Sequence, residues 1–505
     1  MRTAMRVRQV LAVPAHNLTV VPSAAPRRSE RRADATSPSP VGAALHHPGT
    51  ARHRYPGSSA PSLAELVDDD SAESGAVGSD RDPEREALAT TENALAQLWG
   101  AELAVLVGSG TPTATQALLL ARTGDEVLMA RDVPVSSQAA LILAGANPVW
   151  VTPRVEGRCG LGTGIDPADV AAALAEHPQV RTLHVASPSY TGVCSDLVGL
   201  RAVTDQHGVA LVVDESWGPQ LHWHPHLGAS GVSAGADAVI TSAQQLIAAT
   251  PPLSLLVLRG DAFDVTRVAQ AVRMAEPEVP VVPLDAQNFE ARQRLAQQLV
   301  SRVTRSVEVA RLARSMLARV PGVHVLSAAD LALPVDRLDP CTIVLEVNGR
   351  GLDGSSAERL MLENHGIRVD GADARHLYLV IGPEDDVAAV RRLVIAVASL
   401  GSWTGPARRK APDPLAILPT PGEQAITPRD AWYAPAESVR IERSVGRICA
   451  ELVTPYPPGI ALAGPGEVLT TATVAWLLEA VACRMHIRGP SDPSLTTLRV
   501  VVRDR

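Results

Sequence analysis

Apolar and polar positions follow two periods along the chain from about residue 84 onward. The segment 84–100 carries apolar residues at three- and four-residue spacing and stops at Gly100, a pattern typical of an amphipathic helix. Short apolar runs then alternate with helical segments such as 112–121 and 136–145. The predicted strands are Ala104–Val107, Glu126–Met129, Pro148–Val151, Thr182–Ala186, Ala210–Val213, Ala238–Thr241 and Ser254–Leu258. Continuously apolar strands that alternate with helices predict an α/β fold, with a parallel-rich sheet covered by helices on both faces.

Changes of pattern along the chain predict six segments. The first 45 residues hold seven arginines and two acids among Pro, Ser and Ala clusters, without periodicity, which is typical of a disordered basic arm. A helical stretch at 287–317 precedes a smaller α+β unit, whose predicted strands at 341–347 and 376–382 flank a helix at 355–366. In order, the predicted segments are the arm (1–45), an N-terminal segment (46–95), a large domain (96–320), a small α+β domain (321–402), a linker (403–424) and a C-terminal domain (425–505).

Composition narrows the class of protein. The chain has 505 residues and a net charge of −8, so we expect no nucleic-acid partner, and no window approaches the roughly 18 apolar residues of a membrane span. Its five cysteines are scattered and form no C-x-x-C pair, which favours reduced thiols over a disulfide framework or a zinc site. The start of the chain imitates a signal peptide, but Pro14, His16 and Asn17 interrupt its apolar run. We therefore expect a soluble cytoplasmic protein.

Ligands of parallel sheets bind where the strands end, so the residues after each predicted strand form the candidate site. The turn 108-GSGTPTA-114 is small and hydroxyl-rich and leads into a predicted helix. Ser109, Gly110 and Thr111 can therefore offer backbone N–H groups and a helix dipole to a phosphate. Small-residue turns before helices are also common where no phosphate binds, so this turn alone does not define a site.

Three further predicted strand ends carry polar side chains. Asp214 ends the run 209–216 and can pair with a protonated pyridine nitrogen, although an Asp after a strand is more often a turn or cap residue. Ser189 and Tyr190 follow one predicted strand, and Ser242 follows another. We expect these side chains to converge on one edge of the sheet.

Several motifs in order resemble the ornithine/lysine/arginine decarboxylase family, pyridoxal-phosphate (PLP) enzymes of the aspartate-aminotransferase fold (fold type I). They are 186-ASPSYTGVCSDL-197, 213-VDESWGPQLHWHPHL-227, 235-GADAVITSAQQ-245 and 453-VTPYPPGIALAGPGE-467. The resemblance covers roughly residues 45 to 503. It implies a PLP-binding large domain, a small domain and a C-terminal decarboxylase domain. It also implies a homodimer or higher assembly whose active sites lie near the subunit interface.

The chain departs from the family pattern at the residue that holds the cofactor. The family has Ser-x-His-Lys where this chain has Ser242, Ala243, Gln244 and Gln245, so Gln245 stands at the position of the Schiff-base lysine. Covalent PLP chemistry needs a primary amine, and the lone pair of a glutamine amide is delocalised. The chain has one lysine, Lys410, and it falls in the predicted linker.

Two further departures lie elsewhere in the resemblance. Pro134 stands at the place of the family's His that stacks on the pyridine ring, and Pro112 with Thr113 replaces a Gly-Asn or similar pair in the phosphate turn. Pro112 also removes one N–H donor. Trp217 is less informative, because some branches of the family carry Trp there and others His. The resemblance leaves these cofactor-binding candidates: Ser109, Gly110, Thr111, Asp214, Trp217 and Ser242, with Ser189 and Tyr190 in the substrate pocket.

Alternating histidines at His222, His224 and His226 invite comparison with a metal site. The family has a similar His-Pro turn without metal, and no Cys, Asp or Glu nearby completes a ligand set, so we expect none. The Arg-rich helix at 302–314 also holds Glu308 and is interpreted as a solvated face.

Three hypotheses of function follow. The favoured one is a catalytically degenerate decarboxylase homologue, with PLP absent or weakly and non-covalently bound. It would act as a binding or regulatory subunit, as a homo-oligomer or paired with an active decarboxylase paralogue through the shared dimer surface. The second is a decarboxylase or other lyase that uses PLP without a covalent lysine, against which Gln244 and Gln245 supply no base. The third is ordinary amino-acid decarboxylation, which needs an amine from elsewhere.

Overall fold

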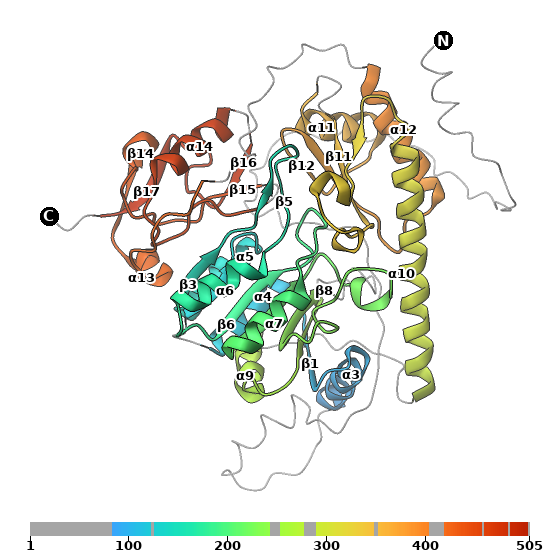
Figure 1. Cartoon of the computed structure of the whole chain (residues 1–505), viewed down its shortest axis with the longest axis horizontal. Helices are drawn as coiled ribbons and strands as arrows, with labels where there is room; N and C mark the ends of the chain where they lie inside the picture. Colours follow the sequence, from blue (N-terminus) through green and yellow to red (C-terminus); the bar gives the residue numbers. More distant parts are fainter. Residues whose placement is uncertain are drawn as a thin grey trace, which may run out of the picture. The chain divides into compact units, whose positions relative to one another are not determined.

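A computed structural model describes eight stretches of the chain, and Figure 1 shows their helices and strands. The described residues are 83–122, 126–242, 253–276, 289–347, 352–402, 419–456, 459–482 and 485–502. The predicted basic arm, most of the N-terminal segment and most of the linker lie outside them. Within the described residues no helix is both long and apolar enough to cross a membrane.

One seven-stranded sheet organises residues 103–258, in the order β1-β9-β8-β7-β6-β2-β3. All seven predicted strands are found, with ends that move by no more than two residues. The strands are β1 (Leu103–Val107), β2 (Glu126–Ala130), β3 (Asn147–Val151), β6 (Thr182–Ala186), β7 (Ala210–Glu215), β8 (Ala238–Ser242) and β9 (Ser254–Leu258).

In this parallel-rich sheet, strand β9 runs opposite to the other six strands. It runs antiparallel to both of its neighbours, β8 and β1, whereas β2, β3, β6, β7 and β8 pair in parallel. The interval between Ser242 and Ser254 is short, and an antiparallel neighbour needs only a return connection, whereas a parallel one needs a crossover of a dozen or more residues. Because β1 is antiparallel to β9, its carboxyl end meets those of the parallel strands at one edge.

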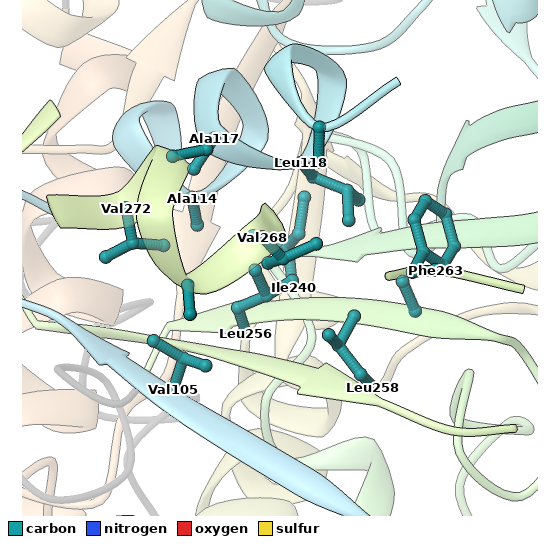
Figure 2. Packing of buried hydrophobic residues seen from close by; sticks show 14 of the residues in the cluster. Val105, Ala114, Ala117, Leu118, Ile240, Leu256, Leu258, Phe263, Val268 and Val272 are labelled. Atoms are coloured by element: carbon teal, nitrogen blue, oxygen red, sulfur yellow. The ribbon is translucent and has the colours of Figure 1, made fainter. Parts of the chain in front are cut away.

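Helices α4 (Thr111–Leu120) and α9 (Val265–Ala275) cover one face of the sheet. Figure 2 shows strand residues Val105, Ile240 and Leu256 packed against side chains of both helices. The labelled helix residues of this core are Ala114, Ala117, Leu118, Val268 and Val272. Helix α5 (Val135–Ala144) packs beside α4. The right-handed crossover rule assigns α6 (Pro167–Glu176) and α7 (Leu197–His207) to the other face, and α7 contacts β7.

The starts of helices α4 and α5 differ from those of α6 and α7. On the side of α6 and α7, Asp166 and Asp196 accept hydrogen bonds from the backbone N–H groups of the first turn, as good N-caps do. Helices α4 and α5 have Gly110 and Pro134 at the N-cap, and neither residue makes a side-chain cap bond. Helices α4 and α5 thus begin without a side-chain cap, whereas α6 and α7 each have one.

The rest of the described chain forms two further groups of elements. Helix α3 (Pro83–Trp99) precedes β1, and the long helix α10 (Phe289–Leu317) leads to a second sheet with the order β10-β11-β13-β12. Its elements are β10 (His324–Val325), β11 (Thr342–Glu346), α11 (Gly354–His365), β12 (Gly371–Ala372), β13 (His376–Val380) and α12 (Val387–Ser399). This is the α+β pattern expected from the sequence.

The C-terminal stretch has a buried core of its own, built from apolar residues between Ile441 and Val500. It contains two two-stranded ladders, β14 with β17 and β15 with β16. Its elements are α13 (Pro428–Tyr433), β14 (Ala436–Arg440), β15 (Thr454–Tyr456), α14 (Thr471–Ala482), β16 (His486–Arg488) and β17 (Thr497–Val501).

Candidate functional site

The carboxyl edge of the large sheet brings the predicted site residues together. Ser254 is the register partner of both Val107 and Ser242, and its hydroxyl lies 3.4 Å from the Val107 carbonyl. One strand further along, Asp214 pairs with Ile240 and with Ala186. The turn after β1, the end of β8, the end of β7 and the residues after β6 therefore share one edge, as the sequence predicts.

The β1–α4 turn (Gly108–Thr111) holds the predicted phosphate-binding residues. Gly110 adopts a φ of +88°, which favours glycine, and its carbonyl accepts the N–H groups of Thr113 and Ala114. Within the described residues nothing accepts a hydrogen bond from the backbone N–H of Ser109, Gly110 or Thr111. The turn therefore keeps part of an anion-binding arrangement, although Pro112 contributes no N–H.

Asp214 lies on β7 and is only 2% exposed. Its Oδ1 atom accepts hydrogen bonds from the backbone N–H of Ser216, at 2.9 Å, and from the Ser216 hydroxyl. Burial raises the pKa of this carboxyl, and the two Ser216 hydrogen bonds only partly oppose the shift. Asp214 therefore lies buried near the carboxyl end of β7, with one oxygen already engaged by its own chain.

Ser189 and Tyr190 follow β6 after a cis peptide bond between Ser187 and Pro188. The Ser189 hydroxyl lies 3.0 Å from that of Thr191, and the Tyr190 hydroxyl donates to the backbone carbonyl of Asp370 at 2.9 Å. Tyr190 is 8% exposed, so its side chain is part of the packed interior.

An aromatic cluster surrounds Tyr190. Its ring centroid lies 4.9 Å from that of Trp217, 5.1 Å from Tyr378 and 5.7 Å from Tyr456. The cluster thus contains three of the five tyrosines of the chain, drawn from three distant parts of the sequence. The Arg488 guanidinium stacks on Tyr456, 3.8 Å from the ring centroid. The sequence prediction includes Tyr190 and Trp217 but misses the partners that enclose them.

A buried carboxylate supports this cluster from the β12–β13 hairpin. Asp373 accepts hydrogen bonds from the Tyr378 hydroxyl at 2.5 Å, from His376 Nδ1 at 3.0 Å and from the backbone N–H groups of Arg375 and His376. Burial alone would raise the pKa of Asp373, but His376 and these donors lower it to about 2. The carboxylate therefore fixes the Tyr378 ring that packs against Tyr190.

Pro134, at the N-cap of α5, stands close in sequence to an ion pair that the sequence prediction misses. Arg131 donates two hydrogen bonds, of 2.6 and 2.8 Å, to the two carboxylate oxygens of Glu467. Its Nε donates to the Ala461 carbonyl at 2.7 Å, and its guanidinium lies 4.4 Å from the Trp150 ring centroid. Both charged side chains are at most 3% exposed. Pro134 thus lies three residues along the chain from a buried arginine that donates three hydrogen bonds.

Two more carboxylates, which the sequence analysis did not predict, accept hydrogen bonds from the unpaired edge of β1. Glu92 on α3 accepts the Leu106 N–H at 3.0 Å, and Glu276, which follows α9, accepts the Gly108 N–H at 2.8 Å. They are 1% and 7% exposed, respectively. Covering unpaired N–H groups protects an edge strand from pairing with another chain.

The three neighbouring histidines pack or face solvent. His222 stacks on Trp99, with ring centroids 5.6 Å apart, and its Nε2 lies 3.2 Å from the Leu98 carbonyl. His226 is exposed and His224 is partly so. In the part of the chain that the structure describes, no group of three or more His, Cys, Asp or Glu side chains is placed to hold a metal ion.

The residues that decide covalent chemistry cannot be placed in the site. Gln244, Gln245 and Lys410 all lie outside the described residues. Their interpretation therefore remains a prediction from the sequence.

Comparison with known protein families shows which family the chain belongs to. Residues 66–337 match the model of the Orn/Lys/Arg decarboxylase major domain, and residues 417–489 match that of the Orn/Lys/Arg decarboxylase C-terminal domain. The fold is that of a PLP-dependent fold type I protein. The chain belongs to the Orn/Lys/Arg decarboxylase family, which uses PLP as its cofactor.

Two curated relatives and two solved structures illustrate the similarity. An arginine decarboxylase of Bacillus subtilis (strain 168) is 28% identical over 80% of this chain and 84% of its own length. The constitutive lysine decarboxylase of Escherichia coli (strain K12) is 24% identical over 79% and 68%. The solved structure of that E. coli enzyme has a TM-score of 0.67, with 19% identity over 81% of this chain and 71% of the other. The lysine decarboxylase LdcF of Francisella novicida has a TM-score of 0.69, with 18% identity and the same coverage. The two structures show the fold.

The residues present do not fit a covalently held PLP. An imine needs an amine, and no described residue is a lysine. Asp214 Oδ1 is engaged by Ser216, and the buried carboxylate of Glu276 accepts the first N–H of the β1–α4 turn. The site therefore keeps the family's strand-end scaffold without the group that would attach the cofactor.

Proposed function

We propose that this chain is a catalytically degenerate member of the Orn/Lys/Arg decarboxylase family that acts as a binding or regulatory subunit. The proposal rests on the lack of a suitable lysine. The chain has one lysine, Lys410, and Gln245 stands where the family has its Schiff-base lysine. Rapid exchange of the cofactor from enzyme to substrate amine depends on that lysine. Neither Gln244 nor Gln245 is a base that could replace it.

Conservation of the scaffold supports a role in binding. The structure keeps the seven-stranded sheet and a C-terminal stretch with its own buried core. Such a chain can assemble with copies of itself, or with an active decarboxylase of the same family through the corresponding surface. We place this assembly in the cytoplasm, with PLP absent or bound weakly and without a covalent bond.

Turnover tests the proposal. The wild-type chain supplied with PLP is expected to release no measurable CO2 from arginine, lysine or ornithine. Gln245→Lys is expected to remain inactive too, because Pro134 and the altered phosphate turn with Pro112 and Thr113 remain. Gln244→Lys is the matched control, since it adds the same amine one residue away.

Two outcomes would count against the proposal in different ways. Turnover by the wild-type chain would remove the proposal altogether. Substantial turnover by Gln245→Lys, absent from Gln244→Lys, would show that the remainder of the site is still competent.

A further inference from the structure

We propose that Glu276 acts as a built-in anion at the β1–α4 turn and thereby excludes phosphate-bearing ligands from it. This inference rests on the proposed function and deepens it, since it concerns the same site. Glu276 is not among the predicted site residues, yet on this proposal it is the reason why the turn would not hold the phosphate group of PLP.

Contact geometry places the carboxylate at the turn. Glu276 Oε2 lies 2.8 Å from the N–H of Gly108, in a buried hydrogen bond. Gly110 is two residues further along, so its N–H lies no more than roughly 10 Å from that oxygen even in a fully extended chain. Glu276 is 7% exposed, so bulk water screens its charge only weakly. Packing of α9 against α4 holds the two segments together.

The negative charge of Glu276 would repel a phosphate group at this turn. The N–H groups of Ser109, Gly110 and Thr111 and the start of α4 would attract an anion, because they carry partial positive charge. Glu276 satisfies the neighbouring Gly108 N–H and brings a negative charge to the same turn. Like charges at this separation in a partly desolvated site weaken binding of a phosphate by at least about tenfold.

Glu92 provides a matched comparison. It makes the equivalent hydrogen bond to Leu106, two residues earlier on the same strand edge, and is also buried. Burial raises the pKa of Glu92 to about 8, so at pH 7 this side chain is mostly protonated. Glu92→Gln therefore changes a carboxyl on the edge of β1 without removing a full negative charge.

Titration calorimetry at pH 7 with pyridoxine 5′-phosphate, and separately with inorganic phosphate, tests the inference on the full chain. Pyridoxine phosphate has no aldehyde, so it cannot form an imine with any amine. Glu276→Gln keeps an acceptor for the Gly108 N–H and removes the charge. We expect it to bind pyridoxine phosphate at least about tenfold more tightly than the wild type, whereas Glu92→Gln binds like the wild type.

Each outcome bears on Glu276 alone. Equal affinity of wild type and Glu276→Gln, whether both bind or neither does, would overturn the inference, as would an equal gain in Glu92→Gln. Glu276→Ser is a second neutral variant in case the glutamine perturbs folding, and it should show the same gain. The calorimetry measures binding and not turnover, so a negative result would leave the proposed loss of catalysis standing. Conversely, turnover in the lysine variants would not change the affinities for pyridoxine phosphate.

Discussion

Arg131→Met is expected to lower the free energy of unfolding by about 3–5 kcal/mol. The substitution leaves the Glu467 carboxylate buried without its partner, and it also removes the hydrogen bond to the Ala461 carbonyl. Removing one member of a buried pair costs far more than the pair contributes, because the remaining charge stays desolvated. Urea unfolding followed by circular dichroism measures the change.

An exposed arginine is the control for this effect. Arg154 pairs with Asp166 and Asp169, and its side chain is 58% exposed. Arg154→Met should therefore leave stability almost unchanged, because exposed ion pairs contribute little. The double variant Arg131→Met with Glu467→Leu should recover a large part of the loss, because both charges are gone. Equal and small losses in Arg131→Met and Arg154→Met would show that the buried pair does not hold its two segments together.

Glu92→Gln is expected to flatten the dependence of stability on pH. Burial raises the pKa of Glu92 from 4.5 to about 8, opposed only in part by its hydrogen bond from Leu106 and by Arg273. Below pH 4.5 both the folded and the unfolded chain hold this proton. Between pH 4.5 and 8 the unfolded chain releases it while the folded chain keeps it, so this contribution to stability is progressively lost as pH rises through 8.

Unfolding in urea at pH 5.5 and pH 8.5 gives the comparison. The loss of unfolding free energy between these pH values should be smaller in Glu92→Gln than in the wild type by at least about 2 kcal/mol. Burial also raises the pKa of Glu215 to about 8, so the variant should flatten the profile only in part. Identical pH profiles for wild type and Glu92→Gln would contradict the assignment of a buried protonated carboxyl.

The sheet is predictable from the sequence because its signal is local. Each strand is a short apolar run, so the pattern of residues identifies β6 and β9 within their observed bounds. Strand β7 extends to Glu215, beyond the predicted Val213, because Asp214 and Glu215 still pair with β8. The direction of β9 is not encoded in its own residues, which read the same in either orientation, and only the pairing with β8 fixes it.

The candidate site is predictable only in part, for the same reason. Position after a strand identifies Ser189, Asp214 and Ser242, since the rule of parallel sheets uses sequence order alone. Contacts between distant segments carry no such signal. Arg131 and Glu467 are 336 residues apart, and Gly108 and Glu276 are 168 residues apart. Their pairing follows from the packing of whole elements, which the residue pattern does not contain.

Borohydride trapping tests most directly the claim that this chain does not carry a covalent cofactor. The purified full chain is incubated with PLP, reduced and analysed by peptide mass spectrometry, with Lys410→Arg as the matched control. We predict no stoichiometric reduced adduct in either protein, and no adduct at all on residues 96–320. One adduct per chain, either within 96–320 or at Lys410 and lost in Lys410→Arg, would contradict the account.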